Sequence, residues 1–407
     1  MFYIVAYQYD VGGVKNMKKA LLVFGSALLT AAFMLTGCGG KTEPENPILS
    51  KDWDWDAHQT WWQPIGSVVQ SAPDGYYLIN RKESRVEYWD LQTDTKVPLC
   101  GKAECTHEDL DCNALLMLGI DPRFLMYQSD GLYMIGEFQQ DKESVAALFR
   151  ENLDGGGWEI VTTMQKMGKT DENSFRAGIR NPMADHGWLY YVYDRPVEEG
   201  DYIPALCRVK MEKDAKPELL YQESGEAYMI RMNQVSVYDG KVYFCSRRYS
   251  SETEADAGLY CYDPVSGETE RLLDRWILSH VMLDGKLYYT ELKQDGIFVY
   301  EPESGKVTSL VEDPASIGEH GLGKRGEMSA DGVYLYHFNR EYEREAFPDQ
   351  IEVNVFSPDG TLQEQILCPN PEGFFLPLWG DENYLFMEEG FNLQCWDKHK
   401  KEWRVLK

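Results

Sequence analysis

Short apolar runs separated by polar turns make up residues 284–310. An Asp-Gly pair opens the first run, a second run covers residues 296–300, and a Glu-Pro-Glu-Ser-Gly turn leads into a third. Turns of this composition between aromatic and branched runs are typical of β-hairpins. The stretch therefore predicts three consecutive antiparallel strands.

The same pattern recurs along the chain, with successive turns 45 to 56 residues apart. Its opening turns are Asp74-Gly75, Asp130-Gly131, Asp185-His186-Gly187, Asp239-Gly240, Asp284-Gly285, Asp331-Gly332 and the degraded Asp381-Glu382-Asn383. Each turn precedes a run with a tyrosine near its centre; these are Tyr77, Tyr133, Tyr190, Tyr243, Tyr288, Tyr334 and Tyr384. The tyrosines often have apolar neighbours on both sides, as Tyr243 does, so both faces of these strands must be covered.

Blades packed around a central channel cover both faces of their inner strands. The repeat therefore predicts an all-β fold, a β-propeller of seven blades with four antiparallel strands each. Six and eight blades are the alternatives, because the first and last repeats have the weakest signatures.

The N-terminal region has the pattern of an export signal. Lys18 and Lys19 precede an uncharged apolar run at 20–34, which ends in Leu-Thr-Gly-Cys38. We expect residues 1–37 to be a signal peptide, with 1–16 a misassigned start ahead of Met17. Cys38 would then carry a lipid that anchors the protein at the extracytoplasmic face of the cell membrane. Residues 38–66 would form a tether and a Trp-rich leader, and 67–407 the β-propeller.

Acidic residues outnumber basic ones, with 67 Asp and Glu against 40 Lys and Arg and a net charge of -27. Nucleic acid is excluded as a partner, because binding it requires a basic face. The acidic surface fits a soluble coat on an exported domain, and we expect a monomer.

Two groups of residues could form sites. Trp53, Trp55, Trp61 and Trp62 could stack on sugar rings as an aromatic ligand platform, or could anchor the leader by packing. Cys100, Cys105, His107 and Cys112 could hold zinc, although their spacing matches zinc fingers poorly. Two of the thiols could instead form a disulfide, or all could be free. We expect this segment to be a structured loop linking blades 1 and 2.

Catalytic motifs are missing from the sequence. It has no Gly-x-Ser-x-Gly elbow, no His-Glu-x-x-His, no P-loop and no dinucleotide fingerprint, and its seven histidines are scattered. We therefore predict no catalytic residues and favour a binding protein over an enzyme.

The Leu-Thr-Gly-Cys38 sequence, the Asp-Gly turns before tyrosine-centred strands, and the segment from Pro98 to Cys112 resemble a known group. They are similar to the uncharacterised extracytoplasmic β-propeller lipoproteins of anaerobic bacteria, distant relatives of TolB-like propellers. The resemblance implies a membrane-tethered propeller and no established catalytic residues.

Two functions follow as hypotheses. The first is a lipoprotein whose propeller binds or scaffolds a peptide, glycan or envelope partner. The alternative is a glycan lyase or hydrolase that uses carboxylates at the channel mouth. Convergence of acids and a histidine from several blades at one end of the channel would favour the enzyme.

Overall fold

The computed structural model describes residues 54–57, 68–108, 111–116, 121–140, 143–166, 178–196, 202–223, 229–249, 255–292, 294–312, 326–339, 350–369, 375–389 and 392–406. All of them belong to one unit of the chain, Pro44–Lys407. Within these ranges, no helix has the length and apolarity that crossing a bilayer requires.

The described residues form seven antiparallel sheets, each built from four strands that are consecutive in the chain and paired in chain order. Blades 1 to 3 contain β1 (Val69–Ala72), β2 (Gly75–Asn80), β3 (Arg85–Asp90), β4 (Thr95–Pro98), β5 (Asp121–Gln128), β6 (Gly131–Gln140), β7 (Glu143–Glu151), β8 (Trp158–Lys166), β9 (Ile179–Asp185), β10 (Trp188–Pro196), β11 (Tyr202–Lys210) and β12 (Glu218–Gln222).

Blades 4 to 7 repeat this arrangement. They contain β13 (Met229–Tyr238), β14 (Lys241–Tyr249), β15 (Ala255–Asp263), β16 (Glu268–Leu273), β17 (Ile277–Leu283), β18 (Lys286–Glu291), β19 (Ile297–Glu301), β20 (Lys306–Val311), β21 (Gly326–Ala330), β22 (Leu335–Asn339), β23 (Gln350–Phe356), β24 (Leu362–Pro369), β25 (Phe375–Gly380), β26 (Tyr384–Glu389), β27 (Asn392–Asp397) and β28 (Glu402–Leu406).

Burial falls from the inner strands of a blade to its last strand. In β14 the consecutive residues Val242, Tyr243 and Phe244 are all buried, whereas β16 at the outer edge of the same blade has no buried residue. Each inner strand is covered on both faces, which explains why its sequence does not alternate between apolar and polar residues.

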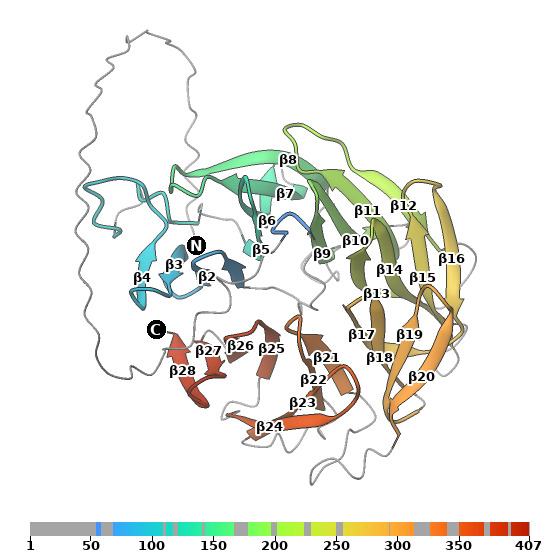
Figure 1. The fold of residues 1–407 in the computed structure, drawn as a ribbon. Coiled ribbons are helices and arrows are strands. Elements are labelled where there is room, and N and C mark those ends of the chain that lie inside the picture. The colour runs from blue at the N-terminus through green and yellow to red at the C-terminus, as the bar shows by residue number, and fades with distance from the viewer. Residues whose placement is uncertain are drawn as a thin grey trace, which may run out of the picture. The chain divides into compact units, whose positions relative to one another are not determined.

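The blades follow one another around a ring in chain order (Figure 1). Hydrophobic clusters join neighbouring blades all the way around it. Separate clusters join blades 2 and 3, 3 and 4, 4 and 5, 5 and 6, and 6 and 7. A further cluster contains Val69 of blade 1, Leu132 of blade 2 and Phe386 of blade 7, so it closes the ring. The prediction of a seven-bladed β-propeller with four-stranded antiparallel blades is confirmed.

Blades 1 and 7 each consist of four consecutive strands, so neither lends a strand to the other, and side-chain contacts close the ring. The Tyr76 hydroxyl on β2 donates to Asp381 Oδ2 of blade 7 at 2.5 Å. The Tyr76 ring contacts Phe386 with centroids 4.9 Å apart, and Arg404 on β28 pairs with Asp94 of blade 1 at 3.0 Å.

The predicted hairpin turns are found, but they do not all have the same register. In blade 4, Asp239 and Gly240 form a two-residue loop with φ of 49° and 69°, the left-handed conformation that Asp and Gly tolerate. In blade 1, by contrast, Ala72 pairs with Gly75, so the prediction that Asp74 and Gly75 form the loop is wrong by one residue. Gly75 is required for another reason, since a Cβ there would lie 2.1 Å from the Trp89 carbonyl oxygen.

Blade 6 departs further from the predicted pattern. Ala330 pairs with Leu335, which places Tyr334 in the turn, 36% exposed, and not at a strand centre as predicted. The buried tyrosine of this blade is Tyr336, whose hydroxyl donates to the turn residue Asp331 at 2.5 Å.

Candidate metal centre

The Cys-His loop, residues 99–116, leaves the outer strand of blade 1 and returns to the strand beside it. Leu99 N donates to Val86 O on β3 at 3.0 Å, and Val86 N donates to Ala114 O at 2.9 Å. Leu116 N then donates to Ser84 O at 2.8 Å. Both ends of the loop are therefore fixed on one strand, which brings its beginning and end together.

Cys100, Cys105, His107 and Cys112 converge inside this loop. Their sulfur and imidazole ligand atoms all lie within 4.8 Å of one another. His107 Nδ1 is 3.4 Å from Cys112 Sγ, and Cys112 is buried. Three thiolates and one imidazole are a standard ligand set for tetrahedral zinc, so the residues present fit this metal. The sequence grouping of these four residues is reproduced as a spatial cluster.

Local turns give the loop its shape. Cys105 N donates to Lys102 O at 3.2 Å, and the Lys102 ammonium donates to the Asp111 carbonyl oxygen across the loop. His107 has a φ of 62°, a left-handed conformation that a non-glycine residue adopts only when its surroundings favour it. The backbone is thus already folded around the four side chains.

The thiols differ in acidity. Burial alone would raise the pKa of Cys100, but hydrogen bonds from the backbone of Lys102 and Asn113 and from the other two thiols lower it overall. Burial raises the pKa of Cys112 to about 11, and its contacts with Cys105 and Cys100 add to the effect. Without a metal, Cys100 therefore ionises more readily than Cys112. A cation would favour the thiolate form of all three.

The loop also rests on blade 2, as expected. Gly101 N donates to Gly155 O at 2.9 Å, and the Asn113 amide donates to the same oxygen at 2.8 Å. Gly155 lies in the turn between β7 and β8 with a φ of 73°, and a Cβ there would lie 2.5 Å from Gly101 N. This close approach requires glycine and links blades 1 and 2.

The predicted tryptophan platform is described only at Trp55. Its ring packs edge-on against Tyr127 with centroids 5.4 Å apart, and the Gln128 amide donates to its carbonyl oxygen at 3.3 Å. Trp55 therefore packs against the hydrophobic core of blades 1 and 2. The other tryptophans and the predicted lipidation site lie outside the described residues; these are Trp53, Trp61, Trp62 and Cys38.

Residues 54–57 of the leader bind to hairpin turns of two blades. Asp56 accepts from Ser129 N and Ser129 Oγ, both at 2.7 Å. His186 Nε2 lies 3.0 Å from Asp54 Oδ2, and its Nδ1 lies 3.3 Å from Asp185 Oδ2. Burial has the largest single effect on the pKa of His186 and lowers it, but the hydrogen bonds and charges of Asp185 and Asp54 together outweigh burial, so the pKa is raised.

Buried carboxylates occur at the turns of blades 6 and 7, where they bind other side chains. Asp331 accepts from Tyr336 and lies 2.5 Å from the Lys398 ammonium. Asp381 accepts from Tyr76, and burial raises its pKa despite this bond and the nearby Lys398. These contacts hold blades 6, 7 and 1 together.

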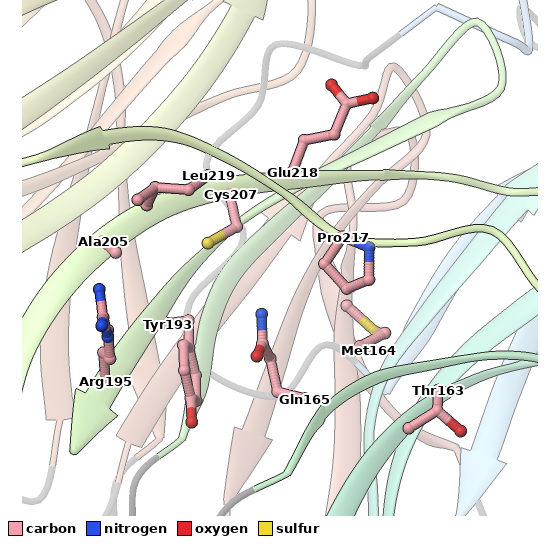
Figure 2. A pocket seen from close by; sticks show the side chains of 10 residues that line it. All are labelled: Thr163, Met164, Gln165, Tyr193, Arg195, Ala205, Cys207, Pro217, Glu218 and Leu219. Atoms are coloured by element: carbon pink, nitrogen blue, oxygen red, sulfur yellow. The ribbon is translucent and has the colours of Figure 1, made fainter.

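A cavity of about 580 Å³ lies between blades 2 and 3, in a place that the sequence did not indicate. It is lined by Thr163, Met164, Gln165, Tyr193, Arg195, Ala205, Cys207, Pro217, Glu218 and Leu219 (Figure 2). These residues come from four strands and from the turn before β12. No motif joins them, so only the packing of the blades reveals the site.

No protein-family model matches the sequence, and no curated protein matches it. Solved structures are similar at low identity. Porphyromonas gingivalis dipeptidyl peptidase 4 is 11% identical with a TM-score of 0.44, and the match covers 91% of this chain but only 56% of that one. The β-propeller domain of the Trilobed protease from Pyrococcus furiosus is 11% identical with a TM-score of 0.48, and the match covers 85% and 98%. Pyrococcus horikoshii acylaminoacyl peptidase is 12% identical with a TM-score of 0.46, covering 85% and 52%.

Proposed function

We propose that this protein is a monomeric, lipid-anchored binding protein at the extracytoplasmic face of the cell membrane, with the propeller as its binding domain. The observation that carries the binding role is the cavity of about 580 Å³ between blades 2 and 3. Its volume is in the range of ligand sites, and its wall combines apolar, aromatic and charged side chains. The partner would be a peptide, a glycan or another component of the cell envelope.

The binding role is tested by capture. Full-length protein in detergent, immobilised on beads, should retain a defined ligand from libraries of envelope peptides and glycans. A competing soluble form of that ligand should release it. Retention of nothing above the level of an unrelated lipoprotein would contradict the binding role.

Anchoring through Cys38 is supported by Lys18, Lys19 and the apolar run at 20–34 before it. Labelled palmitate should be incorporated into the wild-type protein, and Cys38→Ala should leave the protein unlabelled and at precursor size. Incorporation that persists in Cys38→Ala would contradict the anchor.

Zinc at Cys100, Cys105, His107 and Cys112 is the second part of the proposal. The ligand atoms of a tetrahedral zinc site lie roughly 3.5–4 Å apart, and the present cluster, within 4.8 Å, needs only a small contraction. The metal would supply a cross-link to a polar loop that has little apolar area to hold it together. A cross-link here would also support the contact with Gly155 of blade 2.

Metal analysis and thiol titration of protein purified without reductant test this part. We expect one zinc per chain and three thiols that react only after chelation. Two fewer titratable thiols and no metal would show a disulfide in its place. Support for the metal over a disulfide comes from the arrangement of the described cysteines, in which the sulfur atoms of Cys100, Cys105 and Cys112 are grouped with His107 and none of them is in a disulfide.

A further inference from the structure

The cavity between blades 2 and 3 exists because two strands diverge. Asp214 N donates to Val161 O at 2.9 Å, and Thr162 Oγ1 donates to Ala215 O at 2.6 Å, so the turn before β12 is fixed to β8 at that point. Thr163 and the next residues of β8 line one wall beyond these contacts, and the start of β12 lines the other. The opening is therefore wedge-shaped and lies at the side of the ring, between two outer strands.

The inner wall of the wedge is apolar. Met164, Ala205 and Cys207 are buried, at 2%, 1% and 4% exposure, and Tyr193 lies beside them. Thioether, methyl and thiol groups give a sugar few partners for its hydroxyls, but they suit an apolar side chain. Leu219 at the entrance is 56% exposed, and an apolar group in the wedge would cover it.

Charge at the entrance favours an anionic group. Arg195 Nη1 donates to Gln222 at 3.0 Å, its one hydrogen bond among the described residues, so most of its five N–H groups are available. Glu218 is neutralised by Arg208, 2.8 Å away. In Figure 2 the Glu218 carboxylate points away from Gln165, and Tyr193 lies between Arg195 and Gln165 in this view.

The strands on either side suit an extended chain. β8 and β12 are the last strands of their sheets, so each has an edge whose backbone N–H and C=O groups face away from the sheet. Extended peptides bind such edges, and an arginine is well suited to a terminal carboxylate. The regular alternation of N–H and C=O groups along such an edge matches the backbone of an extended peptide, whereas the hydroxyls of a sugar have no such repeat.

We propose that this wedge captures the C-terminal end of a peptide whose last side chain is apolar. Arg195 holds the α-carboxylate, Gln165 and the strand edges hold the backbone, and the side chain enters the space around Met164 and Cys207. This inference rests on the proposed binding function and names the ligand class for it.

Calorimetry on the full-length protein in detergent, with acetyl-Gly-Leu and its C-terminal amide as probes, tests the inference. The acid should bind about tenfold more tightly than the amide, because only the acid forms a charge-assisted pair with the guanidinium. Arg195→Gln should weaken binding of the acid about tenfold and leave the amide unchanged. Leu219→Ser should weaken both probes. Arg271→Gln, which removes an outer-strand guanidinium of blade 4, is the matched control and should change neither.

Equal binding of acid and amide, indifference of the acid to Arg195→Gln, or displacement of the acid by a uronic-acid disaccharide would overturn the inference. So would the absence of binding by either probe. If a partner captured from the envelope is retained equally by wild type and Arg195→Gln, the inference fails while the proposed binding function stands. Unchanged circular dichroism melts would show that each variant is folded.

Discussion

Removing one hydroxyl from Tyr76 should weaken the closure of the ring. Tyr76→Phe keeps the ring contact with Phe386 and deletes the hydrogen bonds of the hydroxyl to Asp381 and Asn383 of blade 7. Asp381 is 3% exposed, so water does not readily replace the lost bond. A hydrogen bond to a buried carboxylate contributes about 2–3 kcal/mol, so we expect the free energy of unfolding to fall by that amount. Equilibrium urea unfolding followed by tryptophan fluorescence measures it.

Tyr336→Phe is the matched control, because its hydroxyl donates to Asp331 within blade 6 at the same distance of 2.5 Å. Both variants should lose similar stability. Only Tyr76→Phe should accelerate proteolysis at the junction of blades 1 and 7, since the Tyr76 bond joins these two blades and the Tyr336 bond lies within blade 6. A loss below about 0.5 kcal/mol for Tyr76→Phe, or equal cleavage of the two variants, would refute the reasoning.

Three further results are expected. Burial lowers the pKa of His280 and His337 from 6.5 to about 4, so between these pH values the folded state binds fewer protons than the unfolded state. The free energy of unfolding should therefore decrease as the pH is lowered from 6.5 to 4, by about 3 kcal/mol per histidine. Urea unfolding at several pH values measures this dependence, and His280→Gln should lose part of it. Chelation should lower the melting temperature of the wild type but not of Cys112→Ala, and equal shifts would exclude zinc at the loop. The raised pKa of His186 makes its ion pair with Asp54 present at low pH and lost as pH rises through that pKa. After division by the intrinsic exchange rate at each pH, the protection of amides at 54–57 from hydrogen exchange should fall with rising pH in the wild type and stay constant in His186→Ala.

The sequence predicts the fold well because the repeat is a local pattern. A tyrosine such as Tyr243 with apolar neighbours can only be buried on both faces, and a ring of blades is the arrangement that provides this for every repeat. The exact turn register is not local. Gly75 is fixed by the Trp89 carbonyl on the neighbouring strand, and no pattern around residue 75 reveals that contact.

The candidate sites also differ in how far the sequence alone predicts them. The four metal-ligand candidates lie within one short loop, so the sequence singles them out as a group, but their spacing leaves metal, a disulfide and free thiols open; the structure shows that the four meet. The contact of the loop with Gly155, which Gly101 and Asn113 make, does not follow from spacing, since it depends on how blade 2 packs. The cavity is the hardest of these features to predict from the sequence. Tyr193, Arg195 and Leu219 belong to no motif, and they line one cavity only because of how blades 2 and 3 pack.

The hydrogen bond that closes the ring is a tyrosine–aspartate bond like the one inside blade 6, but it joins two different blades. In blade 6 the turn residue Asp331 receives a hydroxyl from Tyr336, five residues later in the chain. In blade 7 the residue five positions after Asp381 is Phe386, which has no hydroxyl, and Tyr76 of blade 1 donates in its place. Phe386 instead packs against the Tyr76 ring. The backbone N–H groups of Asn383 and Tyr384 bind Asp381 Oδ1 within blade 7. The loss of one hydroxyl from the last repeat thus leaves the other buried oxygen, Oδ2, to be satisfied by Tyr76 of the first blade, which favours closure at seven blades over an open array.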